Sequence, residues 1–566
     1  MCAQDDKCAL RVEKLTSENK MKILVIIPAR GGSKRIPRKN VRLMNGRPLI
    51  MYSVENALSL KEAFEADVVV STDDEELSGI AADHGAEIVL RGEELSGDSV
   101  TLDPVIFDAL MKMEERHGTH YDTVITMQAT SPTLSRETLK AAIAYFEKGG
   151  YDTVLSVVNK PHLSWTEKDG KIVKNYKERL NSQFLPPNYL ETGAFLISKR
   201  ECVNEKGRIG ENVSVYETSP EEAVDIDSYA DWIEAEAILK RKRVLFRAVG
   251  QRKLGMGHIY RCLSLAYKLI GHEVLFVTDE KSEMGIEKLR SAFFPFEVIK
   301  NNSDYEKVLD SWKPDIVVND ILDTDEDTVK LERRYAKRIV NFEDVGPGAR
   351  GADAVINALY ENHPDKPGNV FEGSDYFFIR DEFLEENPKD FSAECRNVMI
   401  MFGGADPSDL TGRLFKICQH LHEITPETEF HFITGFAYEK KDLIQDIPES
   451  NIFVHNDVKR VSLFMKKADL AVTSQGRTIY ELASMGVPAI VLAQNEREAE
   501  HVFAGIQNGF INLGVGTRTD DETVIRTMRW LIETPNVRKE MRNIELSHEF
   551  RTGQKRVIDI ILKEGS

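Results

Sequence analysis

The sequence lacks three features that define large classes of proteins: paired cysteines, long apolar runs and an excess of positive charge. Its six cysteines are scattered over 566 residues without a Cys-x-x-Cys or a paired Cys/His spacing. This pattern excludes a disulfide framework and the common zinc motifs, so we expect reduced thiols and a cytoplasmic location. No apolar run has the length needed to span a bilayer, so we expect no membrane-embedded part.

The formal net charge of -19 argues against general binding to nucleic acid or to anionic membranes, because both need a surplus of cations. Any phosphate ligand must therefore be held by a local cluster of positive charge. The chain length predicts three or four domains. Residues 1–21 are mostly polar and lack the apolar core of a secretory signal, so we expect a disordered tail.

The most informative stretch is residues 26–40, where an apolar strand runs into a glycine turn rich in Arg and Lys. Such a turn directs backbone N–H groups and cationic side chains at one point, which suits a polyphosphate. We interpret it as a nucleoside triphosphate loop. The alternative is a solvated basic loop after an edge strand, which is what most charged runs are.

Strands and helices alternate after this loop, which predicts a mostly parallel sheet with helices on both faces and a ligand beyond the carboxyl ends of its strands. Polar residues stand at those ends: Arg91 with Asp98, the segment 128–132, and the pair Asp225 and Asp227. In an extended segment the two aspartates share a face and reach a hydrated Mg²⁺ together, although solvated turns also produce Asp-x-Asp. The expected strands are 67–73, 87–90, 123–127 and 153–158, and the expected helices are 48–58, 75–84, 102–115, 136–147 and 231–242.

Together these residues resemble the cytidylyltransferases that activate nonulosonic acids, the sialic acid family, over about residues 22–239. The motif Ile-Pro-Ala-Arg-Gly-Gly-Ser-Lys-x-Ile-Pro-x-Lys-Asn carries the resemblance. It implies a Rossmann-like nucleotidyltransferase domain in which the anomeric hydroxyl of a sugar acid attacks the α-phosphorus of CTP and releases pyrophosphate. It also implies a homodimer formed through this domain. The family's Arg-Gln-Asp and Asn-Gly-Ala are here Ser182-Gln183-Phe184 and Thr192-Gly193-Ala194, so the sugar acid is left open.

The resemblance also implies roles for individual residues. Arg30, Ser33, Lys34 and Lys39 would hold the triphosphate, Asn40, Arg91 and Gln128 would line the cytidine and sugar side, and Asp225 and Asp227 would bind Mg²⁺, with Arg30, Lys39 and Asp227 as the catalytic group.

A second glycine turn begins after a new strand at 244–247, and we place a domain boundary at 241/242. The turn, residues 250–257, leads into a helix with His258 at its N-terminus. A helix N-terminus disfavours imidazolium and so favours a neutral base, although a histidine that merely caps the turn fits the spacing as well.

Two doubly wound domains are expected in this half, split near residues 385–396. The first has strands 273–278, 315–319, 338–342 and 354–357, and the second has strands 398–402, 429–434, 451–455, 469–473 and 488–493. The second contains two anion-cradling turns, 402–407 and 474–477, which predict a nucleotide diphosphate in the cleft. Asp406 is interpreted as a helix cap.

This half resembles the UDP-sugar hydrolase of pseudaminic acid biosynthesis, which has the GT-B architecture of nucleotide-sugar glycosyltransferases. The matching pieces are 255–261, 376–383, 402–407, 480–482 and 485–488. The resemblance implies His258 as the base and Glu481 at the ribose. A UDP-sugar site is implied at Gly257, Arg261, Gly403, Gly404, Glu481, Gln494 and Asn495. Two departures stand out: the family's Asn-Gln pair is reversed at 494–495, and Ile321-Leu322 replaces an expected Tyr.

The leading interpretation is a bifunctional enzyme of nonulosonic acid biosynthesis with CTP, a nonulosonic acid and a UDP-sugar as substrates. Its expected domains are 1–21, 22–241, 242–390 and 391–566. The alternatives make the second half a glycosyltransferase or a non-catalytic nucleotide-sugar sensor.

Overall fold

The computed structural model describes residues 21–97, 99–251, 255–360, 368–435 and 437–563. The expected tail up to residue 20, Asp98, and residues 252–254 of the second glycine turn lie outside the described residues. The chain forms two compact units, Met1–Arg241 and Lys242–Ser566, which we call unit 1 and unit 2. The division into four domains stays a prediction. Within the described ranges, no helix is both long and apolar enough to cross a membrane.

Unit 1 is built on a seven-stranded sheet of order β11-β7-β10-β6-β1-β4-β5. The central strand β1 has five consecutive fully buried residues, as expected of a strand covered on both faces. Alternate residues of β1 enter two cores: Val25 packs with helices α1 and α4, and Leu24 packs with α3. The predicted mostly parallel sheet is confirmed, with one exception. Strand β10 runs antiparallel to both β6 and β7.

The elements of unit 1 are β1 (Lys22–Pro28), β2 (Leu43–Met44), β3 (Arg47–Pro48), α1 (Leu49–Leu58), β4 (Glu65–Thr72), α2 (Glu75–Asp83), β5 (Glu87–Leu90), α3 (Leu102–His117), β6 (Thr123–Thr126), α4 (Arg136–Gly149), β7 (Thr153–Asn159), β8 (Trp165–Lys168), β9 (Lys171–Lys174), β10 (Tyr189–Lys199), β11 (Val213–Glu217) and α5 (Tyr229–Leu239).

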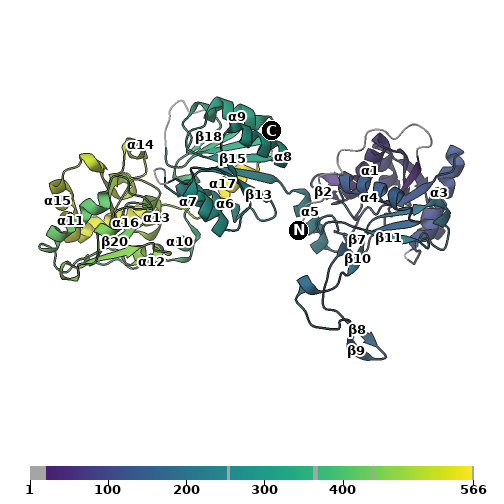
Figure 1. The fold of residues 1–566 in the computed structure, drawn as a ribbon, viewed down its shortest axis with the longest axis horizontal. Helices are drawn as coiled ribbons and strands as arrows, with labels where there is room; N and C mark the ends of the chain where they lie inside the picture. The colour runs from purple at the N-terminus through teal and green to yellow at the C-terminus, as the bar shows by residue number, and fades with distance from the viewer. Residues whose placement is uncertain (1–20, 98, 252–254, 361–367, 436, 564–566) are drawn as a thin grey trace. The chain divides into compact units, whose positions relative to one another are not determined.

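Strands β8 and β9 form a separate two-stranded sheet, which we call the arm, and it projects from the rest of unit 1 (Figure 1). All eight of its strand residues are exposed. Trp165 and Ile172, at 56% and 67% exposure, lie on the same face. The arm was not predicted, because all of its strand residues are exposed and its sequence therefore lacks the apolar pattern of a strand with a buried face.

Unit 2 contains two further sheets, and in both every strand runs parallel to its neighbours. The first has the order β14-β13-β12-β15-β16-β17-β18 and the second β21-β20-β19-β22-β23-β24. Each sheet has a core on both faces. The predicted fold class, α/β with a Rossmann-like unit followed by a pair of doubly wound domains, is therefore confirmed. The sequence did not predict the edge strands β14, β18 and β24.

The elements of unit 2 are β12 (Arg243–Ala248), α6 (Gly257–Ala266), β13 (Glu273–Asp279), α7 (Glu283–Ser291), β14 (Phe296–Ile299), α8 (Asn302–Trp312), β15 (Ile316–Asp320), α9 (Glu326–Arg333), β16 (Arg338–Phe342), β17 (Ala354–Asn357), β18 (Val370–Glu372), α10 (Asp381–Glu385), β19 (Asn397–Met401), α11 (Leu410–His422), β20 (Glu429–Thr434), β21 (Ile452–Asn456), α12 (Ser462–Lys467), β22 (Leu470–Thr473), α13 (Thr478–Met485), β23 (Ala489–Ala493), α14 (Glu496–Ala499), β24 (Phe510–Val515), α15 (Asp521–Glu533), α16 (Pro535–Glu545) and α17 (Gly553–Leu562).

The last helix, α17, returns to the first sheet of unit 2 (Figure 1). Its Val557 and Ile561 are fully buried in the core beneath β12, β15 and β16. Arg338 at the start of β16 donates two hydrogen bonds to the carbonyl of Ile560. The expected domain 391–566 contains α17, whereas this helix packs in the core of the first sheet. The chain therefore passes from the first sheet to the second after β18 and returns to the first sheet at α17.

Candidate functional site

A cavity of about 630 Å³ opens at the carboxyl ends of the central strands of unit 1, where the sequence placed its ligand site. All seven residues predicted to bind CTP line it: Arg30, Ser33, Lys34, Lys39, Asn40, Arg91 and Gln128. Asp227 lines it too. The cavity therefore brings together residues that are up to about 200 positions apart in the sequence, which a merely solvated basic loop would not do.

The glycine turn of residues 26–40 is held in place by acidic residues that follow β4. The Gly31 N–H donates to Asp73 at 3.0 Å, and a Cβ at Gly31 would lie 2.2 Å from Asp74 Oδ2. This close approach explains the first glycine of the turn. A Cβ at Gly32 would meet nothing within 4 Å, and Gly32 lines the cavity, so the second glycine leaves its backbone open to a ligand.

Asp227 is surrounded by cations of the same loop. Its carboxylate lies 3.0 Å from Arg35 and 3.8 Å from the Lys39 ammonium, and its side chain is 60% exposed. Burial lowers the pKa of Lys39, and Asp227 and Asp225 oppose that shift. Lys39 is thus a partly buried cation that faces two carboxylates.

Asp225 differs from Asp227 because it is largely buried. Its Oδ1 atom is inaccessible and has no hydrogen-bond donor within the described residues, and burial raises the pKa of the carboxyl. An unsatisfied buried carboxylate oxygen is costly unless a donor or a cation completes it. Asp227 lines the cavity and Asp225 is not among its lining residues, but both carboxylates are hard oxygen donors of the kind that Mg²⁺ prefers, so these residues fit Mg²⁺.

Contacts with the backbone and with one hydroxyl hold the predicted cytidine and sugar side. Asn40 Nδ2 donates to the Arg30 carbonyl at 3.0 Å, and Arg91 Nε donates to Ser71 Oγ at 3.0 Å. Burial lowers the pKa of Arg91, and Asp73 partly offsets this. Both side chains are therefore positioned by the ends of strands before any ligand binds.

Gly193 is a residue whose role the sequence did not reveal. It lies in the irregular part of β10 with φ +71, and a Cβ there would lie 2.7 Å from Gln128 Nε2. Both the backbone conformation and the close contact favour glycine.

Gly193→Ala is therefore expected to displace Gln128 and to raise the KM for a nucleotide or sugar ligand by about tenfold, in line with roughly 1–3 kcal/mol of local strain. Steady-state kinetics on the full chain measures this. Gly207→Ala is the matched control, because its Cβ would meet nothing within 4 Å and its φ lies outside the left-handed region. Equal kinetics for both variants would contradict the assigned role of Gly193.

A second candidate site lies in unit 2 at the point where the strand order reverses. Strands β13 and β15 flank β12, and α6 begins beyond the end of β12. Ligands of open α/β sheets bind at such switch points. The predicted place of His258 near a helix N-terminus is confirmed, since it is the second residue of α6.

His258 contacts a carboxylate that the sequence analysis did not select. Its Nδ1 lies 2.6 Å from Asp320 Oδ1, at the end of β15. The same carboxylate accepts two hydrogen bonds of 2.6 Å from Arg261. Burial opposes ionisation of Asp320, but Arg261 and His258 outweigh it and hold the pKa of that carboxyl well below its usual range. Asp320 is therefore a fully buried carboxylate that orients the histidine ring.

Arg261 also donates to Glu343 at 3.1 Å, and this glutamate follows β16 with φ +49. Burial raises the pKa of Glu343, with Arg261 opposing the shift. Arg261 was predicted to bind a UDP-sugar, whereas in the structure its guanidinium is engaged by two carboxylates. Its contacts give it a positioning role, and direct ligand contact stays a prediction.

The other residues predicted for the UDP-sugar site have different surroundings. Glu481 forms a two-point ion pair with Arg380, at 2.8 and 3.1 Å. Gln494 donates to Asp406 and Asn495 caps α14, so both side chains support backbone turns. Asp406 caps α11, as predicted, by accepting hydrogen bonds from the backbone of residues 410 and 411. Gly257 begins α6, and Gly403 and Gly404 face open space.

Comparison with known proteins assigns unit 1 to a family. A family model described as Cytidylyltransferase matches residues 24–193. The chain is 34% identical over 230 residues to the pseudaminic acid cytidylyltransferase of Campylobacter jejuni, covering 39% of this chain and 97% of that protein. The chain belongs to the cytidylyltransferase family.

Two other likenesses cover a larger share of the chain than unit 1 does. The spore coat polysaccharide biosynthesis protein SpsG of Bacillus subtilis is 28% identical over 298 residues, covering 50% of this chain and 86% of that protein. The match covers 50% of the chain, which is more than the length of unit 1, so it must extend into unit 2. MurG of Acinetobacter baumannii has a TM-score of 0.42 at 16% identity, covering 57% of this chain and 99% of that one. The chain spans about half the length of the first curated relatives it matches.

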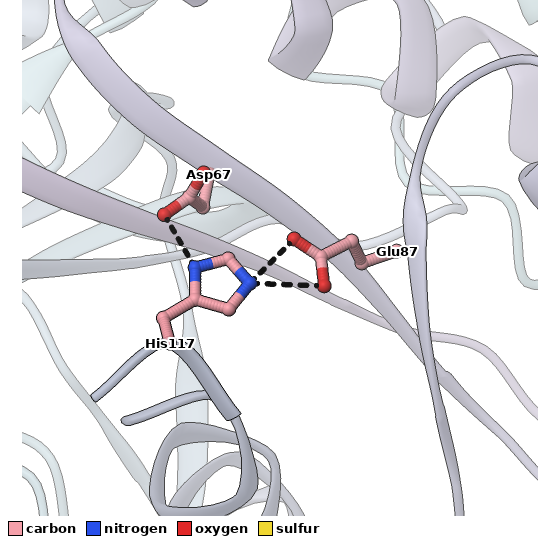
Figure 2. A group of neighbouring side chains, drawn as sticks. All are labelled: Asp67, Glu87 and His117. Carbon is pink, nitrogen blue, oxygen red and sulfur yellow. Dashed lines mark hydrogen bonds and ion pairs between the residues drawn. The ribbon is translucent and has the colours of Figure 1, made fainter. Parts of the chain in front are cut away.

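The cytidylyltransferase unit also carries a cluster of possible metal ligands, Asp67, Glu87 and His117, away from the cavity residues (Figure 2). The imidazole lies between the carboxylates, with Nδ1 3.2 Å from Asp67 and Nε2 2.9 Å from Glu87. Arg116 pairs with Glu87 as well. Because both ring nitrogens of His117 already contact carboxylates, we assign the cluster to side-chain contacts that tie the end of α3 to β4 and β5.

Proposed function

We propose that unit 1 transfers CMP from CTP to a nonulosonic acid and releases pyrophosphate. The observation that supports this most is the single cavity lined by Arg30, Lys34, Lys39 and Asp227 at the strand ends. Relatives that match over 97% of their own length include proteins named pseudaminic acid cytidylyltransferase and CMP-N,N'-diacetyllegionaminic acid synthase. Both names describe CMP transfer to an acid of this class.

The residues of the cavity supply positioning and charge rather than a covalent intermediate. Arg30, Ser33, Lys34 and Lys39 hold the triphosphate, while Asn40, Arg91 and Gln128 orient the nucleoside and the sugar acid. The anomeric hydroxyl oxygen then bonds to the α-phosphorus as the bond to pyrophosphate breaks and its proton passes to water, and cations stabilise the charge that develops. Mg²⁺, held by Asp225 and Asp227, would neutralise charge on the triphosphate oxygens.

Pyrophosphate release from CTP, measured with several nonulosonic acids, tests this proposal and identifies the acid. We expect one acid to give a kcat/KM at least about tenfold above the others, because one mispaired polar group costs more than about 1.4 kcal/mol. Release that does not depend on the added acid would contradict it.

We propose that unit 2 hydrolyses a UDP-linked diacetamido trideoxy sugar. The supporting observation is the contact between Asp320 and His258 Nδ1, which leaves Nε2 as the basic nitrogen. Nε2 takes a proton from water, the water oxygen bonds to the anomeric carbon, and the bond to UDP breaks. The released UDP and the protonated histidine balance the step.

Two other functions remain for unit 2, because its fold supports several chemistries. A glycosyltransferase would release UDP only with an acceptor, whereas a hydrolase releases it in water. A sensor would let UDP-sugar alter CTP consumption without turning over. Incubating the full chain with UDP-sugar and no acceptor, with CTP consumption followed in parallel, distinguishes the three. UDP release supports the hydrolase and its absence excludes it, whereas altered CTP consumption without UDP release supports the sensor.

We propose further that unit 1 forms a homodimer through the arm. A lone two-stranded sheet is marginal in water, and a second arm would cover the exposed Trp165 and Ile172, whose face also carries Glu167 and Lys174.

Sedimentation of the full chain is expected to show twice 64.1 kDa, and Ile172→Lys is expected to weaken the dimer by about tenfold or more, because it buries a charge. Val173→Lys, on the opposite face of the arm, is the control. A monomeric wild-type chain would rule out the arm as a dimer surface.

A further inference from the structure

One of the two anion-cradling turns predicted in unit 2 is open and the other is filled. A Cβ at Gly403 or Gly404 would meet nothing within 4 Å. At the second turn, just before α13, a Cβ at Gly476 would lie 3.2 Å from Glu498 Oε1. The place that the sequence predicts for a phosphate is therefore taken by a carboxylate of the chain itself.

The contacts of Glu498 are those of a bound anion. Its carboxylate accepts hydrogen bonds from the backbone N–H groups of Gln475 and Gln494 and from the Ser474 hydroxyl. No ion pair joins it to any cation among the described residues. Burial raises its pKa to about 7, against the effect of these hydrogen bonds, and the nearby Asp406 raises it further. Glu498 thus uses the donors that a phosphate oxygen would need.

A cation of the same turn, Arg477, lies near Glu343 and Glu481 but forms no ion pair with them. Arg477 lies 4.3 Å from the ring centre of Phe377 and donates to the Phe378 carbonyl at 3.1 Å. Across the described ranges it forms no ion pair. Burial and the neighbouring Arg261 lower the pKa of Arg477 to about 10. A guanidinium whose pKa is lowered by burial is stabilised in its charged form when an anionic ligand binds beside it.

Glu498 belongs to a short helix that is fastened to the first sheet of unit 2. The preceding residue on α14, Arg497, forms a two-point ion pair with Asp323 at 2.9 and 3.0 Å. Asp323 lies in the loop after β15, close in sequence to Asp320. Helix α14 therefore places the Glu498 carboxylate in the turn before α13 and, through Arg497, contacts the loop after β15 of the first sheet.

We infer that Glu498 determines the specificity of unit 2 for phosphorylated ligands: its carboxylate occupies the phosphate place before α13, and a nucleoside diphosphate enters that turn only when α14 withdraws. The inference rests on the proposed nucleotide-sugar function of unit 2. A ligand without phosphates does not compete with Glu498.

Calorimetric titration of the full chain with UDP tests this, after the cavity of unit 1 has been saturated with CTP in the presence of EDTA. We expect Glu498→Ala to bind UDP about tenfold more tightly and Glu498→Gln to bind it more tightly by a smaller factor, because the amide keeps the shape but loses the charge. Asp323→Asn is expected to tighten binding as well by releasing α14. The affinity for uridine should stay unchanged in all three variants.

Glu496→Ala is the matched control, since Glu496 lies on the same helix but pairs with the exposed Arg518. If the wild-type chain binds UDP and Glu498→Ala binds it equally or less tightly, the inference is overturned while the nucleotide function stands. If neither protein binds UDP at millimolar concentration, both are overturned. Tighter uridine binding in Glu498→Ala would also overturn the inference, because it would indicate a general loosening of the site.

Discussion

Asp227→Asn is expected to reduce CMP transfer by about 100- to 1,000-fold without weakening the binding of CTP in EDTA. The two effects separate because Asp227 lies beside Arg35 and Lys39 in the same cavity. Removing its negative charge leaves the cavity more positive, so a triphosphate alone binds equally well or better. The turnover falls because a carboxylate that would hold Mg²⁺ is lost.

The measurement combines pyrophosphate release in Mg²⁺ with CTP titration in EDTA. Glu236→Gln serves as the control, since this residue lies on α5 and pairs with Lys240 at the surface. Unchanged turnover in Asp227→Asn would refute the metal assignment. Loss of CTP binding in EDTA would instead assign Asp227 to the architecture of the loop.

The second large effect is expected at His258 of unit 2. His258→Gln should lower UDP release from the UDP-sugar by about 100- to 10,000-fold, because the chain then lacks its base. Asp320→Asn should give a comparable loss, since an amide that donates to Nδ1 would place the proton on Nε2, the nitrogen that must accept it.

Asp320→Asn also leaves Arg261 without its main partner, and removal of one member of a buried pair costs about 3–5 kcal/mol. Thermal unfolding therefore accompanies the kinetics, and His258→Gln, which keeps the Arg261 pair, separates the chemical effect from the loss of stability. The control is His420→Gln on the exposed side of α11. Full UDP release by His258→Gln in a folded chain would exclude His258 as the base of the hydrolysis.

The cavity of unit 1 was predictable because its residues obey a local rule: they follow buried strands, and the ends of parallel strands meet at one edge of a sheet. Arg30, Arg91 and Gln128 were identified in this way. Gly193 was not, because its importance comes from contact with Gln128 across an antiparallel strand that no local pattern indicates.

In unit 2, the helix that carries His258 was predictable from its glycine turn, whereas the carboxylate beside it was missed. A signal was present: Asp320 ends an apolar strand, and Arg261 follows His258 by three residues on one face of α6. The filling of the second anion turn by Glu498 was not predictable, because the two segments lie in separate stretches of sequence and the turn pattern looks the same whether it is empty or filled.

The return of α17 to the first sheet of unit 2 has a consequence for biosynthesis. Unit 1 is complete when residue 241 has left the ribosome, so it can fold while the rest is still being made. The sheet built from β12 to β18 still lacks Val557 and Ile561 at that stage and throughout the synthesis of the second sheet. The part of its core that α17 covers stays exposed until α17 has been made, so the first sheet of unit 2 is completed only after the second sheet has been synthesised.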